Sequence, residues 1–203
     1  MFPVFISAFS ISLVAALTPG PVIAVTLAKS YQSPWSGVKV ALGGLVAEVP
    51  IILLIYFGFA KFLQSDVIQA ILGISGGLML LVLSVMLIRK RSTVNLYSKD
   101  LPISSFKLGF VTAIVNPGMV PWWVTIGALL ISQASTFGIS GLILIILAIE
   151  LPNFLWYSTA SFLFHRYHNL WSAQFQSILI IIFSVILAGF GVWFLYDTIT
   201  TII

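Results

Sequence analysis

Two glutamates lie within long apolar stretches of the sequence, where a charged side chain is costly. Glu48 belongs to the stretch 37–63 and Glu150 to the stretch 138–163. An ionised carboxylate in hydrocarbon costs on the order of several kcal/mol, so such residues face a bundle interior or water and are functional candidates. Because burial disfavours the charged form, each carboxyl could load a proton on one side of a membrane and release it on the other. It could also stay ionised and bind a cationic amine, and a purely structural glutamate is the third interpretation.

Helical spacing gives both glutamates companions on one face. Around the first glutamate, the small residues Gly37, Ala41 and Gly44 lie at i, i+4 and i+7, and Glu48 itself follows at i+11. Small faces let helices approach closely, so Glu48 is predicted to point into the bundle and away from lipid. Around the second glutamate, polar residues form a stripe at i, i+3, i+7 and i+11: Glu150, Asn153, Tyr157 and Ser161. Such a stripe along an apolar helix is suited to lining a path.

Two proline–glycine sites interrupt other apolar stretches. The first reads Thr18-Pro19-Gly20-Pro21, and the second reads Asn116-Pro117-Gly118. A helix cannot run straight through such residues, and helices broken at membrane depth are tolerated where they line a wet cavity. Two breaks, one in each half, indicate a transport site. Thr18 and Asn116 could bind a substrate carboxylate there or simply cap a half-helix, and a plain proline kink is the alternative.

The composition indicates that these segments cross a membrane. The 203 residues are 60% hydrophobic and 7% charged, with a mean hydropathy of +1.16. A span needs about 20 apolar residues, and six such stretches fit: about 2–28, 37–63, 67–88, 108–132, 138–163 and 175–197. The expected fold is all-α and polytopic, with six transmembrane helices of which the first and fourth are broken. The first stretch is interpreted as a span and not as a removable signal peptide.

The two halves look related. Pro19-Gly20 and Pro117-Gly118 are 98 residues apart, and Glu48-Val49-Pro50 and Glu150-Leu151-Pro152 are 102 residues apart. With three spans per half, the second half would have the opposite orientation in the membrane. This predicts a 3+3 inverted repeat with its site near the midplane. We expect one transporter domain over 1–203, with repeat one at 1–91, a basic loop at 89–107 and repeat two at 106–203.

The third and sixth spans carry small residues that could pack together within the chain or between the subunits of a homo-oligomer. These residues are Gly73, Gly76, Gly77 and Ser84 in one span and Ser184, Ala188 and Gly191 in the other.

The basic residues predict the orientation. Placing the loop 89–107 in the cytoplasm puts eight of the nine Lys and Arg residues inside, with both termini outside the cell membrane. The net charge of +4 is therefore interpreted as a topology signal, Lys29 and Lys39 included, and not as a nucleic-acid surface. His165 and His168, beside Arg166, are expected in a solvated loop and not as a metal pair.

No catalytic set, resident metal or cofactor is expected, and the chain is not predicted to be an enzyme. It has no cysteine, no HExxH and no phosphate-binding GxxxxGK[ST] motif. Active transport would then depend on an ion gradient or on a partner protein. Trp122 and Trp123 could wall a pocket, but the interpretation favoured here is an anchor at the membrane interface.

Several of these motifs together resemble the lysine exporter (LysE/RhtB) family of amino-acid effluxers. They are the proline–glycine–proline break, Lys29-Ser30, Gly37, Gly44, Glu48, and Asn116-Pro117 after Phe106-x-x-Gly109. The resemblance covers nearly the whole chain. It implies export of amino acids or related small amines, coupled to protons or membrane potential, by alternating access at a site formed by Pro19, Gly20, Pro21, Glu48, Asn116 and Pro117. The partners implied are a small-molecule substrate, the lipid bilayer and a coupling ion.

Two departures from the family pattern leave the substrate open. Asn116-Pro117 is followed by Gly118-Met119 and not by a basic or bulky residue, and Glu48 stands where the exporters of basic amino acids often have aspartate. One alternative is a divalent-cation exporter that uses Glu48 and Glu150 as oxygen ligands. A non-transporting membrane scaffold is another.

Overall fold

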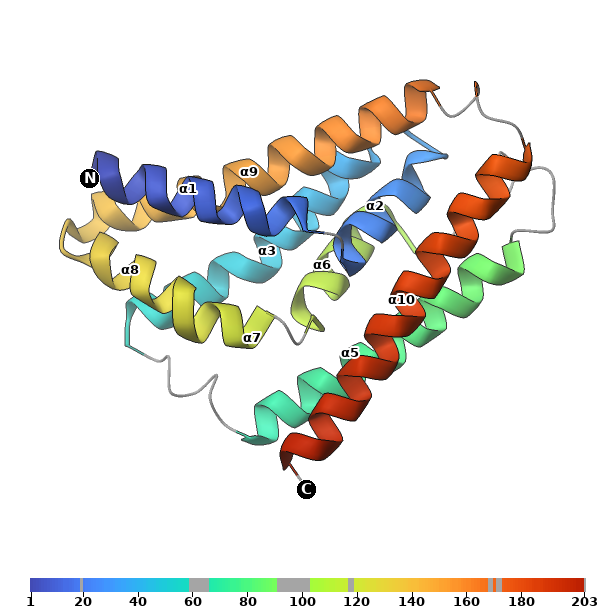
Figure 1. The fold of residues 1–203 in the computed structure, drawn as a ribbon. Helices are drawn as coiled ribbons and strands as arrows, with labels where there is room; N and C mark the ends of the chain where they lie inside the picture. The colour runs from blue at the N-terminus through green and yellow to red at the C-terminus, as the bar shows by residue number, and fades with distance from the viewer. Residues whose placement is uncertain are drawn as a thin grey trace.

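The described part of the protein is built from helices (Figure 1). The structure is a computed structural model that describes residues 1–18, 20–58, 66–90, 103–116, 119–167, 170 and 173–202. The helices are α1 (Phe2–Leu17), α2 (Pro21–Ser30), α3 (Ser36–Tyr56), α5 (Asp66–Lys90), α6 (Ser105–Ile114), α7 (Met119–Trp122), the π-helix η1 (Trp123–Gly127), α8 (Ala128–Ser135), α9 (Gly138–Tyr167) and α10 (Ala173–Ile202). The predicted all-α class is confirmed.

The first predicted break is confirmed. Helix α1 ends at Leu17 and α2 begins at Pro21, and the two helix axes are bent by 65°. Gly20 precedes α2 in a fully extended conformation, with φ −163° and ψ −175°. Pro21 then occupies the first helical position, where a missing N–H is harmless because that amide has no partner in the helix anyway. Pro19 lies outside the described residues.

The second predicted break is also present, and it is followed by an unexpected element. Helix α6 ends at Ile114, Val115 and Asn116 leave the helix, and α7 begins at Met119. The amide of Met119 donates to the carbonyl of Asn116 at 2.8 Å. From Trp123 to Gly127 the chain then forms a π-helix, a rare conformation that often occurs at functional sites. This π-helix was not predicted from the sequence. Pro117 lies outside the described residues.

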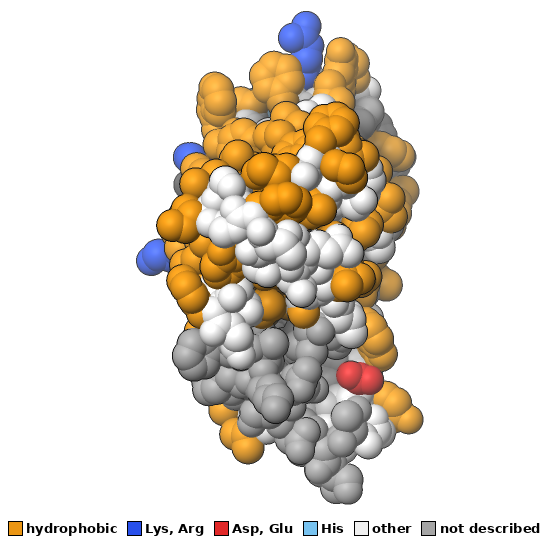
Figure 2. All heavy atoms as spheres, turned by 90° about the vertical axis from the view of Figure 1, so that its left-hand side faces the viewer, with side chains coloured by type: hydrophobic (Ala, Val, Ile, Leu, Met, Phe, Trp, Pro, Cys, Tyr) orange, Lys and Arg blue, Asp and Glu red, His pale blue; other side chains and the backbone are white. Residues whose placement is uncertain are grey.

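The described helices include clear candidates for membrane spans. Helices α3 and α9 and the part of α10 at Ser177–Thr200 are long and apolar enough to cross a bilayer, and so is the bent pair α1–α2 taken as one span. The third and fourth predicted spans correspond to shorter apolar helices within the described residues, at Gly73–Met86, Ser105–Ile114 and Thr125–Ser135. Hydrophobic side chains gather on the upper part of the face shown in Figure 2, and many large hydrophobic residues are exposed, as expected for contact with lipid. The chain is a polytopic membrane protein, and the count of six spans stays a prediction.

Glycines let the helices pack backbone against backbone. Helices α3 and α6 lie together, with Gly43 against the carbonyl of Phe106 and Gly109 against the carbonyl of Val40. Gly37 of α3 lies equally close to the carbonyl of Tyr157 in α9. Of the small face predicted for the stretch 37–48, Gly37 makes such a contact, whereas Gly44 meets only the side chain of Glu48.

Helices α5 and α10 form a second closely packed pair, which Figure 1 shows side by side. Gly77 and Gly191 face each other, and the hydroxyl of Ser84 donates to the carbonyl of Ser184 at 2.8 Å. The small residues of the third and sixth predicted spans thus pack within one chain. Helix α1 lies against α9 (Figure 1).

This packing makes a prediction about Gly109. A Cβ atom at this position would lie 2.7 Å from the Cα of Val40, so a larger side chain must push α3 and α6 apart. We expect Gly109→Val to lower the free energy of unfolding by about 1–3 kcal/mol. Thermal unfolding in detergent would measure this. The matched control is Gly189→Val, because a Cβ at Gly189 meets nothing within 4 Å. Equal midpoints for the two variants would contradict the packing.

Candidate functional site

A cavity of about 240 Å³, called the central cavity below, lies where the two breaks face the long helices. Helices α1, α2, α3, α6, α7 and α9 and the π-helix all contribute to its wall. Its polar and aromatic lining residues are Ser12, Glu48, Asn116, Trp122, Trp123, Asn153 and Tyr157. It is smaller than the roughly 300–1,000 Å³ of drug-sized pockets, so it suits a small solute.

Glu48 lies in the wall of the central cavity, as predicted from its position on the small face of α3. Its Oε1 atom lies 4.0 Å from the position that a Cβ would take at Gly44, one turn earlier. Gly44 therefore lies next to the carboxylate, at a distance that a small side chain would also allow. Glu48 is the charged residue of this cavity among the described residues that line it.

Glu150 lies behind the cavity wall and not in it. Its side chain is only 6% exposed, whereas its neighbours Ile149 and Asn153 line the cavity. Within the described part of the chain, its Oε1 atom has no hydrogen-bond partner. Glu48 is close enough for a negative charge on it to act electrostatically on both Glu150 and Tyr157. The two carboxyls predicted to lie in the bundle therefore form a neighbouring pair of which only one faces the cavity.

A second cavity of about 200 Å³, called the break cavity below, lies beside the first and includes the break between α1 and α2. Thr18, Gly20 and Pro21 line it, and it shares Ala15, Val22, Asn116 and Tyr157 with the central cavity. The first-turn amides of a helix have no partner within the helix, and Val22 and Ile23 from this turn of α2 line the break cavity. The positive end of the α2 dipole thus faces this space.

Thr18 does not cap the second half-helix. Its hydroxyl donates back to the carbonyl of Val14 at 2.9 Å, and the N-cap of α2 is Gly20. Asn116, by contrast, lines both cavities and so connects them. Seven of the ten predicted site residues come together in the two cavities: Thr18, Gly20, Pro21, Glu48, Asn116, Asn153 and Tyr157. Glu150 lies behind them, and Pro19 and Pro117 fall outside the described residues.

The favoured interpretation of the tryptophans was wrong. Trp123 is 1% exposed and Trp122 is half-buried, and both line the central cavity instead of anchoring the chain at an interface. Ser12, which is not among the predicted site residues, lines the same cavity and is 2% exposed. Among the described atoms, its Oγ has no hydrogen-bond partner. The signal was present, because Ala8, Ser12 and Ala16 follow one another at i, i+4 and i+8 and form the buried face of α1.

At the far end of α2, a layer of polar groups ties this helix to α9. The hydroxyl of Ser30 donates to that of Ser161 at 2.9 Å, and Nδ1 of His165 donates to the carbonyl of Ser30 at 2.7 Å. The solvated loop predicted for His165 is therefore wrong, since this residue is half-buried in α9. His168 lies outside the described residues.

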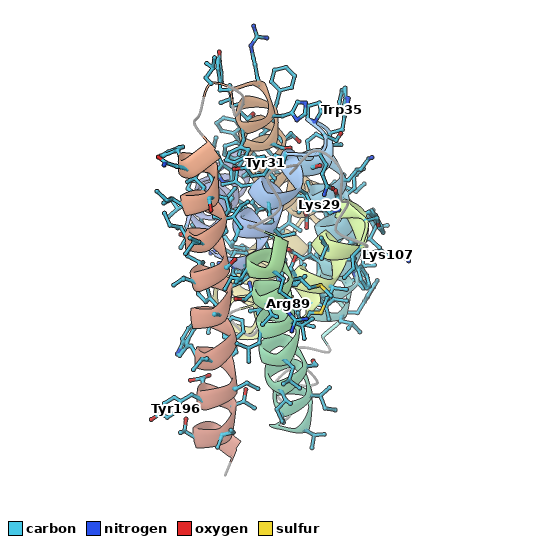
Figure 3. The ribbon with its side chains drawn as sticks, turned by 90° about the vertical axis from the view of Figure 1, so that its right-hand side faces the viewer. Lys29, Tyr31, Trp35, Arg89, Lys107 and Tyr196 are labelled. Atoms are coloured by element: carbon cyan, nitrogen blue, oxygen red, sulfur yellow. The ribbon has the colours of Figure 1, made fainter. Side chains whose placement is uncertain are left out.

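Lys29 belongs to the same layer. It is 3% exposed, and its Nζ donates to Oε1 of Gln32 at 2.9 Å. Burial raises the pKa of Tyr31, just beyond α2, to about 12, so its phenol stays neutral. Figure 3 shows Lys29, Tyr31 and Trp35 towards one end of the molecule and Tyr196 at the other.

Comparison with known proteins identifies the family. The sequence matches the LysE type translocators over residues 13–198. The chain belongs to this family. It is also 24% identical over 200 residues to a Bacillus subtilis (strain 168) protein described as "Putative amino acid efflux protein YcgF", with 96% of each chain covered. No solved structure shows a significant match. The resemblance inferred from the break and glycine motifs is thus confirmed.

The geometry can be checked with introduced cysteines, because the natural chain has none. We expect Ser12→Cys to react with a small membrane-permeant thiol reagent, since Ser12 lines the central cavity. The matched control is Ser184→Cys, which is fully buried between α10 and α5 and away from both cavities. Labelling can be measured by mass spectrometry in detergent. A Ser12→Cys protein as unreactive as the control would contradict access to this cavity.

Proposed function

We propose that this protein exports amino acids or related small amines across the cell membrane. The observation that carries the proposal is the pairing of a carboxylate in one cavity with the N-terminus of a half-helix in the next. A free amino acid carries an ammonium and a carboxylate close together, so it needs complementary groups of both signs. The efflux assigned to the related Bacillus subtilis protein adds support from outside the structure.

Each end of the substrate has a partner in this proposal. Glu48 binds the ammonium through a charge-assisted hydrogen bond, a strong type of contact at this depth. The first turn of α2 and the amide of Asn116 bind the carboxylate. Tyr157 and Asn153 supply further hydrogen bonds between the two ends, because both line the central cavity.

Coupling to protons or to membrane potential is assigned to the glutamate pair. Two neighbouring carboxyls cannot both ionise readily in a site of low dielectric constant, so a proton held by one favours a charge on the other. Glu150, buried behind the wall, is the proton carrier in this scheme, and Glu48, in the wall, is the ammonium ligand.

Alternating access follows from an inverted repeat in which residues 1–91 and 106–203 are equivalent. The contacts between helices support this pairing, because α3 packs on α6 as α9 packs on α1, and α2 packs on α9 as α8 packs on α3. Ser84 and Ser184, which are 100 residues apart, also meet directly. Equivalent residues would meet in this way where the pseudo-two-fold axis crosses α5 and α10.

The proposed orientation keeps the loop 89–107 and the C-terminal end of α2, at Ser30, on the cytoplasmic side, with both termini outside. The excess of Lys and Arg in that loop supports it, together with the basic residues between the first and second predicted spans and between the fifth and sixth. The layer around Ser30 and Ser161 would then close the cytoplasmic side of the cavities.

Neutralising Glu48 tests the substrate contact. We expect Glu48→Gln to reduce amino-acid transport in proteoliposomes roughly tenfold to a hundredfold, because a hydrogen bond to a charged group is worth about 1.5–3 kcal/mol. The matched control is Asp197→Asn, which removes an exposed carboxylate outside both cavities and should leave transport unchanged. If a broad amino-acid panel is carried equally well by the wild type and Glu48→Gln, the proposed role of Glu48 is wrong.

Neutralising Glu150 separates coupling from binding. We expect Glu150→Gln to abolish concentrative transport driven by a proton gradient while substrate exchange at equal concentrations continues. Both can be measured in the same vesicles, with and without an imposed pH difference. Loss of exchange and of driven transport in parallel, in a variant that keeps its thermal midpoint, would remove Glu150 from the coupling role.

A further inference from the structure

We propose that the transported amino acids have uncharged, apolar side chains, and that Trp122 and Trp123 form the subsite that selects them. The inference rests on the proposed export function and narrows its substrate class. It starts from an imbalance in the central cavity, where polar groups on α1, α3 and α9 share the wall with an apolar surface made of Met119, Trp122, Trp123 and Ile149.

The two indoles form a rigid wall. Their ring centroids lie 4.8 Å apart and their planes meet at 84°, an edge-to-face arrangement in which each ring limits the movement of the other. Trp123 is packed into the apolar core that also contains Met119 and Ile149, so it cannot rotate away without opening that core. A preformed aromatic wall of this kind binds an apolar side chain with little loss of conformational entropy.

The π-helix adjoins both rings, because it follows Trp122 directly. It begins at Trp123, where the backbone changes from the short helix α7. Gly127 closes the π-helix, and a Cβ there would lie 2.5 Å from Cε3 of Trp123 and 3.2 Å from Cζ3 of Trp122. The rings therefore lie over a glycine backbone, and Gly127 is a positioning residue for the wall.

The charges of the lining disfavour the other side-chain classes. Glu48 is the charged group among the described residues that line the two cavities, and the ammonium of every amino acid already needs it. A lysine side chain would bring a second cation to a wall without a second carboxylate, because Glu150 lies behind that wall. A glutamate side chain would bring a negative charge into the cavity that holds Glu48.

Ser12 supplies a second, independent sign that a ligand belongs here. Its hydroxyl is 98% hidden from solvent yet, among the described atoms, has no partner. A buried polar group is normally hydrogen-bonded, so a hydroxyl that lines a cavity in this state points to a ligand group or water as its partner. The main-chain end of an amino acid carries donors and acceptors that fit it.

The test is transport by the full-length protein in liposomes, with L-leucine, L-alanine, L-lysine and L-glutamate compared one at a time. We expect kcat/KM for leucine to exceed that for lysine and for glutamate by roughly tenfold or more. Trp122→Ala is expected to raise KM for leucine roughly tenfold, with a smaller effect on alanine, whose side chain barely reaches the wall. The matched control is Trp35→Ala, because Trp35 is 64% exposed and lies outside both cavities.

The outcomes separate this inference from the function on which it rests. Transport of lysine or glutamate as efficient as that of leucine overturns the selective wall and leaves amino-acid export standing. Equal losses for leucine and alanine in Trp122→Ala also overturn it. Transport of no amino acid overturns both. If Trp122→Ala does not fold, the thermal midpoint of the unmodified protein decides, since leucine should raise it more than lysine does.

Discussion

The structure depends on one constraint, which is that a backbone in hydrocarbon must satisfy its own hydrogen bonds. A helix can stop inside a membrane only where something other than lipid meets its ends. Both breaks in this chain obey the rule, because Gly20 and Pro21 face the break cavity and Asn116 faces both cavities. The same prolines and glycine that interrupt the helices therefore create the polar surface from which a transport site can be built.

Close helix packing leaves the central cavity as the place where polar side chains of α3 and α9 gather. Gly37, Gly43 and Gly109 bring α3 against α9 and α6 with backbone in contact, so the interior has few places for a side chain as long as glutamate. Glu48 has such a place in the wall of the central cavity, next to Gly44. The polar stripe on α9 leads away from the cavity. It runs from Asn153 and Tyr157 in the cavity wall to Ser161 in the polar layer that joins α2 to α9.

The sequence was informative where chemistry and periodicity coincide. Helical spacing correctly placed Glu48 in the bundle and Asn153 and Tyr157 on a common face, because one face of a regular helix follows from position alone. It could not place Trp123, since an indole near the end of an apolar stretch suits an interface as well as a cavity. What decides its place is tertiary packing, because Trp123 lies in the apolar core with Met119 and Ile149 and its ring lies against Gly127. Ser12 was missed for a simpler reason, as serine is common in membrane helices and only its small neighbours Ala8 and Ala16 mark its face as buried.

The two breaks are alike in sequence but not in their surroundings. Gly76 of α5 lies directly against the carbonyl of Val115, so α5 closes on the second break. At the first break, α10 faces the space with Phe190, Trp193 and Phe194, and the break cavity remains between them. If the two halves are equivalent, as the proposed inverted repeat has it, this difference would mark one half as closed and the other as open. In the proposed alternating access, the opposite conformation would bring α10 to the first break while α5 leaves the second. Because α5 and α10 are packed along each other through Gly77 and Gly191, one movement of this pair could do both.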